Sequence, residues 1–548
     1  MRNPEIAVKQ KNKDRPLILL FSRAENGAAA HADHAALLII ALAFLCGAWL
    51  AANRFLNGDE AMNALWANMD SWRQTYENST IPEHIHPPLY LVSLHFWRVL
   101  FGNSEFSLRL PSLLCAAGYL WLLYKWVKLR FNASAALTAL IVLAFSPAVM
   151  TLGVEIRTYA ALLFLMAAAL YTLELAFARN SVRLFALYSL ILCLSVLNSY
   201  SSIWFILAAH LYAFIRFLRR QLPLRMGVIW AALQLPSAVL GALLYFKHVR
   251  FARATGFDNA ATTWLKASFM GPEESIPTFV VESTFSVFEY VLYYREASPI
   301  AALLFAAALA LLLFQHLRRA GPEAPVAGWM LVVPAALASI ASIANIAPYG
   351  ASRHSIVAAN FMVIGASYAL SRIMSRRVLP VLVLGVVLTP IWSINARNAW
   401  YFPGTDYEKA AMTSVLQDMR LRIPADGHLF LDRQSCMIMK YYLGKDHADP
   451  MYVWKAPFPI RLGGYNLSCY MQTWSFSAKG FPGAVASARS RFDIHPSTPL
   501  WVFDAGWGTN LANDLRWNSN VLPLDLQWHG KGIALFRYST ISENAGRP

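Results

Sequence analysis

The stretch AALLIIALAFLCGAWLAANRFL, from Ala35 to Leu56, is the first long apolar run of the chain. About 20 mostly apolar residues are needed for a helix to cross the hydrocarbon core of a bilayer. The run follows a basic segment, it is too long for the core of a signal peptide, and no small-residue cleavage site follows it. It therefore predicts an uncleaved membrane span that begins after a basic tail of residues 1–34.

Similar runs recur over the first four hundred positions. The chain has 548 residues, of which 57% are hydrophobic and only 14% are charged, and this composition is typical of a polytopic membrane protein. The sequence predicts an all-α membrane bundle over residues 35–397 with about eleven spans, at 35–56, 104–124, 134–153, 158–178, 184–199, 202–217, 226–246, 299–316, 327–346, 355–371 and 378–396.

The chain has a net charge of +16, and the distribution of its basic residues indicates how the chain is oriented in the membrane. Lys and Arg lie in short clusters between apolar runs, which argues against a nucleic-acid partner and for basic cytoplasmic loops. If the N-terminus is cytoplasmic, alternate loops are all basic and an odd number of spans places the C-terminal part outside. We expect a multi-pass protein of the bacterial inner membrane. KHVRFAR (Lys247–Arg253) breaks the pattern, and it would contact either anionic headgroups or the phosphate of a substrate.

The pattern changes after residue 397. YEKAAMTSVLQDMR predicts an amphipathic helix, whereas HLFLD, WVFD and IALFRY predict strands. Residues 398–548 are therefore expected to form an extracytoplasmic α/β domain. Cys436 and Cys469 both fall in this domain, and the sequence leaves open whether they form a disulfide.

Two outer loops are long. The first covers residues 57–103. It contains an apolar stripe that predicts a juxtamembrane helix lying in the interface, formed by Leu89, Val92, Phe96, Val99 and Leu100. The second, residues 247–298, is long enough to act as a mobile cover.

Asp59 and Glu60, in NGDEAMNALW, are placed at the end of the first predicted span. Met62, Asn63 and Trp66 continue from Asp59 at helical spacing. Adjacent side chains on a helix point about 100° apart, so the two carboxylates are expected to have separate roles. Asp59 suits a general base, and Glu60 suits the orientation of a neighbour or the binding of a cation. The alternative is that the two residues form a solvated helix N-terminus, where the helix dipole favours acidic side chains.

Further ionisable residues fall in the other predicted outer loops. EHIHPP (Glu83–Pro88) offers a metal or phosphate site, although two histidines at this spacing are weak evidence. A cation pair at a helix start suits a phosphate, whereas surface ion pairs and a snorkelling Arg are the alternatives. The candidates are His86, Arg109, Glu155, Arg157, Tyr349, Arg353 and His354.

These groups converge above predicted spans whose middles are nearly free of charge. A proton-coupled transporter would be expected to carry acidic residues at mid-depth. The layout instead matches a substrate with a lipid tail and a phosphate head.

The motifs resemble those of the glycosyltransferases of family 39 and their bacterial relatives. These include protein O-mannosyltransferases, lipid A aminoarabinose transferases and galacturonosyltransferases of the lipopolysaccharide core. The resemblance is carried by the acidic pair after the first run, HPPLY (His86–Tyr90), LRLPS (Leu108–Ser112), the element IRTYAAL (Ile156–Leu162) with Arg157 and Tyr159, and Arg353 with the nearby aromatic Tyr349. It extends over about residues 35–397.

The resemblance implies a C-type fold and the transfer of a sugar, with inversion, from a polyprenyl-phosphate donor to an extracytoplasmic glycan, lipid or protein. Asp59 matches the position of the base, and Glu60 its neighbour. The residues before the two prolines are Ile85 and His86 rather than Glu and Lys, which argues against aminoarabinose and leaves a divalent cation open as a cofactor. A flippase for a lipid-linked sugar and a non-catalytic member of the fold are the alternatives.

Overall fold

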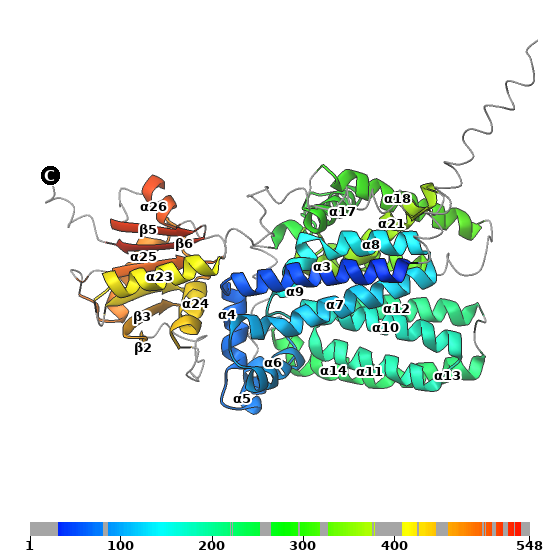
Figure 1. Ribbon diagram of the computed structural model, residues 1–548, viewed down its shortest axis with the longest axis horizontal. Helices are drawn as coiled ribbons and strands as arrows, with labels where there is room; N and C mark the ends of the chain where they lie inside the picture. The colour runs from blue at the N-terminus through cyan, green and yellow to red at the C-terminus, as the bar shows by residue number, and fades with distance from the viewer. Residues whose placement is uncertain are drawn as a thin grey trace, which may run out of the picture.

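The computed structural model describes residues 31–80, 86–219, 221, 223–252, 265–293, 296–317, 327–374, 377–378, 408–424, 427–444, 459–495, 498, 500–506, 511–518, 524–530 and 532–538. A bundle of long helices forms one part, and a small α/β domain lies beyond one end of it (Figure 1). The short helix α4 (Gly58–Ala67) lies where the two parts meet, so we call this end of the bundle the α4 end.

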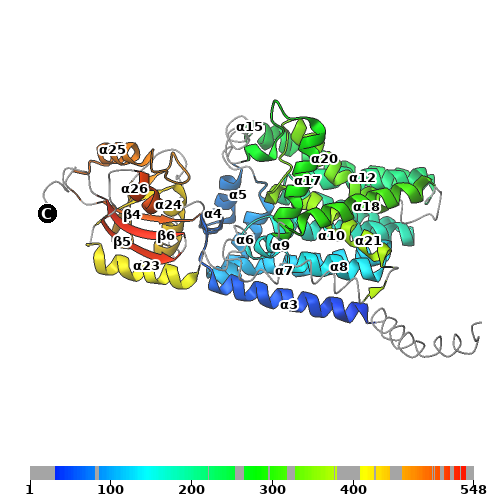
Figure 2. The ribbon, with the colours of Figure 1, turned by 90° about the horizontal axis from the view of Figure 1, so that it is seen from above.

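The bundle confirms the predicted helical membrane architecture. Its helices are α3 (Ala32–Asn53), α7 (Glu105–Arg130), α8 (Ala133–Ala144), α9 (Pro147–Val154), α10 (Tyr159–Arg179), α11 (Val182–Asn198), α12 (Ser202–Leu218), α13 (Leu224–Leu233), α14 (Leu235–Leu244), α17 (Ile276–Leu292), α18 (Ser298–Leu317), α20 (Trp329–Ile343) and α21 (Ile356–Ile373). A π-helical turn, η1 (Tyr245–Val249), and α15 (Arg250–Ala252) follow α14. Figure 2 shows α3 running along the outside of the bundle.

Six of the described helices, or seven if α8 and α9 form one bent span, are long and apolar enough to cross a membrane. The predicted span 134–153 is bent by 63° between α8 and α9, where Ser146 and Pro147 start a new helix. Ten of the eleven predicted spans coincide with helices, although α11, α12 and α20 are shorter than a full span. The eleventh, 378–396, lies outside the described residues apart from Val378.

The loop expected to be a mobile cover contains a packed helix. Within 247–298, α17 contacts α9, α18 and α21, and Val287 and Phe288 are buried in the main apolar core. Its apolar residues are mixed with Glu282, Glu289 and several hydroxyl side chains. This mixture lowers the hydrophobicity of the segment, so the sequence did not predict a bundle helix there.

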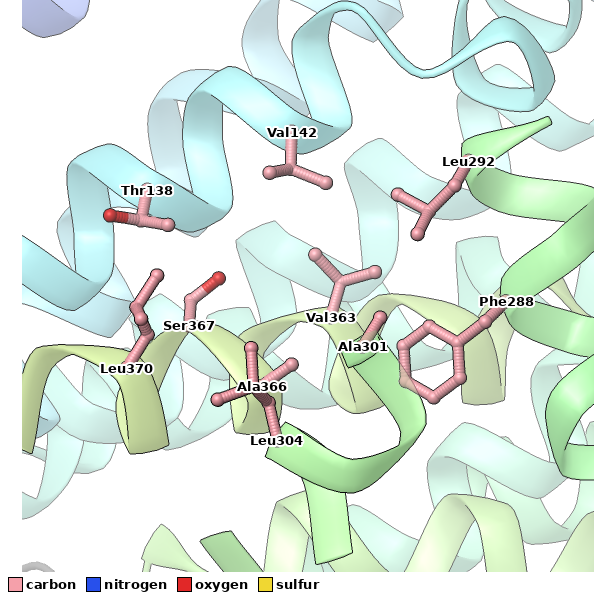
Figure 3. A pocket seen from close by; sticks show the side chains of 10 residues that line it. All are labelled: Thr138, Val142, Phe288, Leu292, Ala301, Leu304, Val363, Ala366, Ser367 and Leu370. Atoms are coloured by element: carbon pink, nitrogen blue, oxygen red, sulfur yellow. The ribbon is translucent and has the colours of Figure 1, made fainter. Parts of the chain in front are cut away.

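The bundle interior is closely packed. One void of about 20 Å³ lies between α8, α17, α18 and α21, and its lining is apolar except for Thr138 and Ser367 (Figure 3). A space of this size holds about one water molecule, so it offers no room for a substrate. Glu174, inside the predicted span 158–178, is buried and pairs with Arg130 and Arg216. The expectation of nearly uncharged spans therefore needs this correction.

Three short helices follow the first span. Helix α4 begins with a capping box, in which Asn57 and Glu60 exchange hydrogen bonds, and α5 (Trp72–Ser79) and α6 (Leu89–Phe101) come after it. In α6, Tyr90, Leu91 and Leu94 are buried, while the predicted stripe residues Phe96 and Val99 are exposed. An exposed apolar face of this kind suits a helix that lies on the bilayer surface.

The C-terminal domain contains a six-stranded sheet in the order β2-β3-β1-β4-β6-β5. Strand β1 is parallel to β3 and β4, and the other pairs are antiparallel. The three predicted strands are β1, β4 and β6. The elements are α23 (Lys409–Arg422), β1 (His428–Asp432), α24 (Arg433–Gly444), β2 (Pro459–Leu462), β3 (Tyr465–Tyr470), α25 (Phe481–Arg491), β4 (Leu500–Ala505), α26 (Leu511–Asn518), β5 (Leu524–Gly530) and β6 (Ile533–Tyr538).

The domain and the bundle share a core. One apolar cluster contains Phe55 and Met62 at the α4 end together with Met437 and Leu467 of the domain. Cys436 and Cys469 form a disulfide that ties α24 to β3. The Tyr442 hydroxyl accepts a hydrogen bond of 2.9 Å from the Leu56 amide. Helix α24 is thus the element through which the domain contacts the bundle.

Candidate active site

A cavity of about 610 Å³ opens at the α4 end, between the bundle and the C-terminal domain. One part of its lining is polar and comes from the first residues of helices and the connections before them, and the other part is apolar and comes mainly from α12, α20 and α21. The polar side includes Asp59, His86, Arg157, Tyr159, Ser199, Tyr200, Arg353, His354 and Arg433, and the apolar side includes Ile203, Trp204, Leu265, Pro334, Ala338, Val357 and Ala358.

Asp59 lies between two arginines from distant parts of the chain. Its Oδ2 is 2.8 Å from an Nη of Arg353, at the start of η4 (Arg353–Ser355), and 3.1 Å from an Nη of Arg157, in the turn between α9 and α10. Both contacts fall on Oδ2, which leaves Oδ1 without a hydrogen-bond partner among the described residues. Two guanidinium groups thus contact one oxygen of a carboxylate that can accept a proton.

Burial and charge act in opposite directions on Asp59. Burial raises the pKa of its carboxyl, whereas Arg157 and Arg353 lower it, and the resulting pKa is below the ordinary value of 3.8. Asp59 is therefore ionised at neutral pH, and removal of a guanidinium group from its side would make it a stronger base.

Glu60 belongs to a different network. Its two carboxylate oxygens each lie 2.8 Å from a nitrogen of Arg109, and both side chains are fully buried. Arg109 also donates to the carbonyls of Ala51, Arg54 and Phe55, so all five of its N–H donors are used. This differs from the expectation that Arg109 would bind phosphate, because no donor is left for a ligand.

Glu60 also holds the turn that carries Arg157. The amide of Ile156 donates to Glu60 at 3.2 Å, and the carbonyl of Ile156 accepts a bond of 2.7 Å from the Asn63 side chain. Glu60 and Asn63 are three residues apart on α4 and therefore share one face. Glu60 and Arg109 therefore hold α4 and the turn before α10 together, and neither residue is part of the cavity lining.

Tyr159 lies between the two arginines. The guanidinium carbons of Arg157 and Arg353 are each 5.9 Å from the centre of its ring, and the His354 ring meets it edge-on at 6.2 Å. His86 joins the lining directly before the two prolines that lead into α6. Six of the predicted site residues thus share the cavity.

Glu155 and Tyr349 lie behind the lining. Glu155 is buried at the end of α9, and its Oε2 has no hydrogen-bond partner within the described part of the chain. Burial raises the pKa of its carboxyl to about 7, against the lowering effect of Arg353. Tyr349 shares a hydrogen bond of 3.0 Å with Thr284 of α17, and its amide donates to Ser268. Tyr349 therefore anchors the loop before Arg353 rather than contacting a ligand in the cavity.

Arg433 and Trp474 of the C-terminal domain also line the cavity, and the sequence analysis did not single them out. The sequence did contain an indication for Arg433, because this residue directly follows the predicted strand HLFLD. Ligands commonly bind at the carboxyl ends of parallel strands. Tyr200 is another addition, and its hydroxyl lies 2.6 Å from His248 of the KHVRFAR segment.

A metal site is not formed by the residues seen in the structure. Among the ranges that it describes, three or more His, Cys, Asp or Glu side chains nowhere come together to hold an ion. Glu83 and His84 of the EHIHPP motif fall outside those ranges.

Residues 85–242 match the family model described as dolichyl-phosphate-mannose-protein mannosyltransferase. No curated protein sequence matches the chain. Among solved structures, ArnT from Cupriavidus metallidurans bound to undecaprenyl phosphate has 14% identity and a TM-score of 0.49, with 91% of this chain and 97% of that chain covered.

A second solved structure is the Archaeoglobus fulgidus oligosaccharyltransferase in complex with zinc and sulfate. It has 13% identity and a TM-score of 0.49, with 85% of this chain and 68% of that chain covered. The family-model match falls on the segment that carries HPPLY, LRLPS and IRTYAAL. It confirms that this chain is similar to the C-type glycosyltransferases, as its motifs indicated.

Proposed function

We propose that the protein is an inverting glycosyltransferase that moves a sugar from a polyprenyl-phosphate donor to an extracytoplasmic acceptor. The observation that carries this proposal is the two-sided cavity, in which apolar walls from α12, α20 and α21 lead to Asp59, Arg157 and Arg353. The apolar walls suit a lipid chain, and the two guanidinium groups suit a phosphate. The matched family model names enzymes that use a sugar on a lipid phosphate.

The proposal includes a location and an orientation. The tail 1–34 would be cytoplasmic, the bundle 35–397 would lie in the bacterial inner membrane, and residues 398–548 would be periplasmic. The basic clusters between spans support this orientation. The Cys436–Cys469 disulfide supports it independently, because disulfides persist in oxidising compartments.

In the proposed reaction, an acceptor hydroxyl gives its proton to Asp59 while its oxygen bonds to the anomeric carbon of the donor sugar. The bond between that carbon and the phosphate oxygen breaks on the opposite face, which inverts the configuration. Polyprenyl phosphate leaves with the bonding electrons. Arg157 and Arg353 would stabilise the charge that develops on the phosphate, so no strong general acid is required.

The same two arginines would also control the base. In the empty site they hold the pKa of Asp59 below its ordinary value. A donor phosphate that draws them away would raise this pKa and make Asp59 a better proton acceptor. Donor binding would thereby activate the carboxylate before the acceptor reacts.

The replacement Asp59→Asn tests this function. It removes the base but keeps the size of the side chain, so sugar transfer should fall by roughly 10²- to 10⁴-fold. Binding of undecaprenyl phosphate should persist, because Arg157 and Arg353 remain. Transfer would be measured by mass spectrometry of envelope glycolipids and glycoproteins from cells with the wild type, the variant or neither.

Asp70→Asn is the matched control, since Asp70 is exposed on the loop after α4. Transfer retained by the Asp59 variant would contradict its role. A wild type that moves a lipid-linked sugar across the membrane without joining it to an acceptor would indicate a flippase. A wild type that binds the donor and never turns it over would indicate a non-catalytic member of the fold.

A further inference from the structure

Two carboxylates of the C-terminal domain lie at the carboxyl ends of adjacent parallel strands. Strands β1 and β4 pair Phe430 with Val502, so the same register brings Asp432 and Asp504 side by side two residues further along. Side chains two residues apart on a strand point to the same face, so both carboxylates project from one face of the sheet. Both residues are buried. Water therefore screens their charges from each other only weakly.

We infer that Asp432 and Asp504 hold one proton between them, and that loss of this proton disrupts the part of the domain that lines the cavity. The placement of Arg433 and Trp474 in the cavity would then depend on the pH around the domain. The inference concerns the structure of the domain and does not depend on the transfer reaction proposed above.

The hydrogen bonds favour Asp504 as the residue that keeps the proton. Both oxygens of Asp432 accept backbone amides, from Ser435 at 2.8 Å and from Phe476 at 3.2 Å, as suits a carboxylate. Oδ2 of Asp504 accepts the amide of Leu511 at 3.0 Å, whereas its Oδ1 has no hydrogen-bond partner within the described ranges. A charged oxygen that is buried without a donor is costly, and a proton on Asp504 removes that charge.

Burial also acts on the pair. It raises the pKa of both carboxyls above the ordinary value of 3.8, and the negative charges of Asp432 and of Asp514 on α26 raise the pKa of Asp504 further. Above about pH 4 the unfolded chain carries both charges, while the folded domain keeps one proton. The stability from this proton is therefore complete below that pH and is lost as the pH rises to the raised pKa of the pair.

The elements packed against the pair do not offset its charge. Tyr470 of β3 pairs with Asp432, and Ala534 of β6 pairs with Asp504, and neither neighbour is charged at neutral pH. Of the cations on α24, Arg433 lines the cavity and Lys440 lies two turns further along the helix. Among the described residues, no cation lowers the pKa of either carboxyl.

Asp432 joins the two segments through which the domain reaches the cavity. These are the first turn of α24, which carries Arg433, and the segment that carries Trp474. The carboxylate accepts one amide from each of them. The first two amides of α24 also donate to the carbonyls of Thr473 and Trp474, each at 3.2 Å. A second negative charge beside Asp432 would strain this junction, because two buried like charges repel each other.

The end of β4 also contacts α24 and, through it, α4 (Figure 1). The Ser435 hydroxyl donates to the carbonyl of Ala505 at 3.3 Å and accepts its amide at 3.2 Å. Gly506, with a φ of 116°, lies so close to Gln434 that a Cβ there would be 2.6 Å from the Gln434 Cδ. A Cβ at Gly58 of α4 would lie 2.6 Å from the Gln434 Cβ. A displacement at the end of β4 would thus reach α4 through one side chain.

Hydrogen exchange of the full-length protein in detergent, followed by mass spectrometry, tests the inference. The probes are the amides that donate to the pair, at Ser435, Phe476 and Leu511. After correction for the intrinsic pH dependence of exchange, their protection factors should fall by about tenfold per pH unit from about pH 5 up to the pKa of the pair. This slope is the one expected when opening releases a single proton.

Asp504→Asn should keep these protection factors independent of pH over the same range. Its side-chain oxygen can still accept the Leu511 amide, and its NH₂ group donates as a protonated carboxyl would but cannot become charged. Asp493→Asn is the matched control and should reproduce the decline of the wild type, since Asp493 is exposed after α25. Glu155 is present in all three proteins, so its own titration cancels in the comparison.

The link to the cavity has a separate measurement. With fluorinated tryptophan, the fluorine NMR resonance of Trp474, assigned from its loss in Trp474→Phe, should shift with the same pH midpoint as the exchange. It should stay constant in Asp504→Asn. A resonance that does not follow the titration would overturn the link to the cavity.

Constant protection factors in the wild type would overturn the shared proton without any variant. An Asp504→Asn protein that declines like the wild type would overturn it as well. Sugar transfer is not measured in these experiments, so each outcome is independent of the proposed function.

Discussion

Asp59 and Glu60 are adjacent in the sequence but have different partners. Asp59 faces the cavity and contacts Arg157 and Arg353, whereas Glu60 points into the protein and pairs with Arg109. Breaking a buried ion pair of the second kind typically costs about 3–5 kcal/mol, because the remaining charge is left unpaired. One side chain of the pair is therefore available for chemistry while the other stabilises the fold.

Glu155 gives the site a predicted pH dependence. Its carboxyl has a raised pKa of about 7, so between about pH 4.5 and 7 the folded protein keeps a proton that the unfolded chain loses. The stability from this group is complete below pH 4.5 and falls as the pH rises towards 7. Glu155→Gln should remove this decline and stabilise the protein above pH 7 by on the order of 3 kcal/mol relative to the wild type.

Thermal unfolding in detergent between pH 4.5 and 8 checks this prediction. The wild type and the Gln variant should melt at similar temperatures at the acid end and diverge as the pH rises. Glu77→Gln, on α5, serves as a control because Glu77 is exposed. Parallel melting curves for the wild type and Glu155→Gln would show that Glu155 does not titrate in this range.

The sequence predicted the residues of the site better than their contacts. Helical spacing was enough to separate the directions of Asp59 and Glu60. The partners depend on contacts over long distances in the chain, since Arg353 is 294 positions from Asp59. Arg109 illustrates the limit, because only the structure shows that backbone carbonyls and Glu60 occupy all of its donors.

Helix α4 is the element on which the site depends. It presents Asp59 to the cavity, Glu60 and Asn63 to the turn before α10, and Gly58 to the C-terminal domain. Its capping box fixes where the helix begins, and therefore the direction in which each of these side chains points.

Gly58→Ala tests the contact between α4 and α24. The added methyl group would collide with the Gln434 side chain and backbone, so we expect a loss of about 1–3 kcal/mol in stability and weaker transfer. Differential scanning fluorimetry and limited proteolysis of the domain would measure the effect. Gly483→Ala in α25 is the control, because a Cβ there meets nothing within 4 Å. Equal behaviour of the two variants would argue against a close contact at Gly58.

Apolar patterns in the sequence located most of the helices. They failed where a bend or the packing against other helices determines the structure. The run 134–153 is continuous in composition, yet it bends between α8 and α9 because Pro147 cannot continue a helix from the preceding turn. Helix α17 was missed because its polar residues lower its hydrophobicity, although its buried face packs on three other helices. In the C-terminal domain, short apolar runs that contain aromatic residues identified β1, β4 and β6.

At the scale of the whole molecule, the bundle and the C-terminal domain form one unit. Lys409 of α23 pairs with Glu105 at the start of α7 at 2.5 Å, and the Tyr441 hydroxyl donates to the carbonyl of Asn103. The shared apolar cluster adds to these polar contacts. Motions of the domain would therefore be transmitted to the cavity.

The disulfide is predicted to support this arrangement. Cys436 and Cys469 close a loop with a sequence separation of 33, and loss of such a bond typically costs about 2–4 kcal/mol. Replacement of both cysteines by Ser should lower the melting temperature and reduce transfer, because α24 carries Arg433. Cys46→Ser is the control, since Cys46 is an exposed free cysteine of α3. An unchanged melting temperature in the double variant would show that the bond adds no stability.

The position of α24 in the chain has a consequence for biosynthesis. Asp59 is made early and Arg433 late, and the two meet only after the domain has folded against α4. A ribosome-bound chain that has inserted its bundle but not yet released residues 398–548 would hold an unfinished cavity. The order of synthesis itself would thus delay activity until the final domain has reached its compartment and docked.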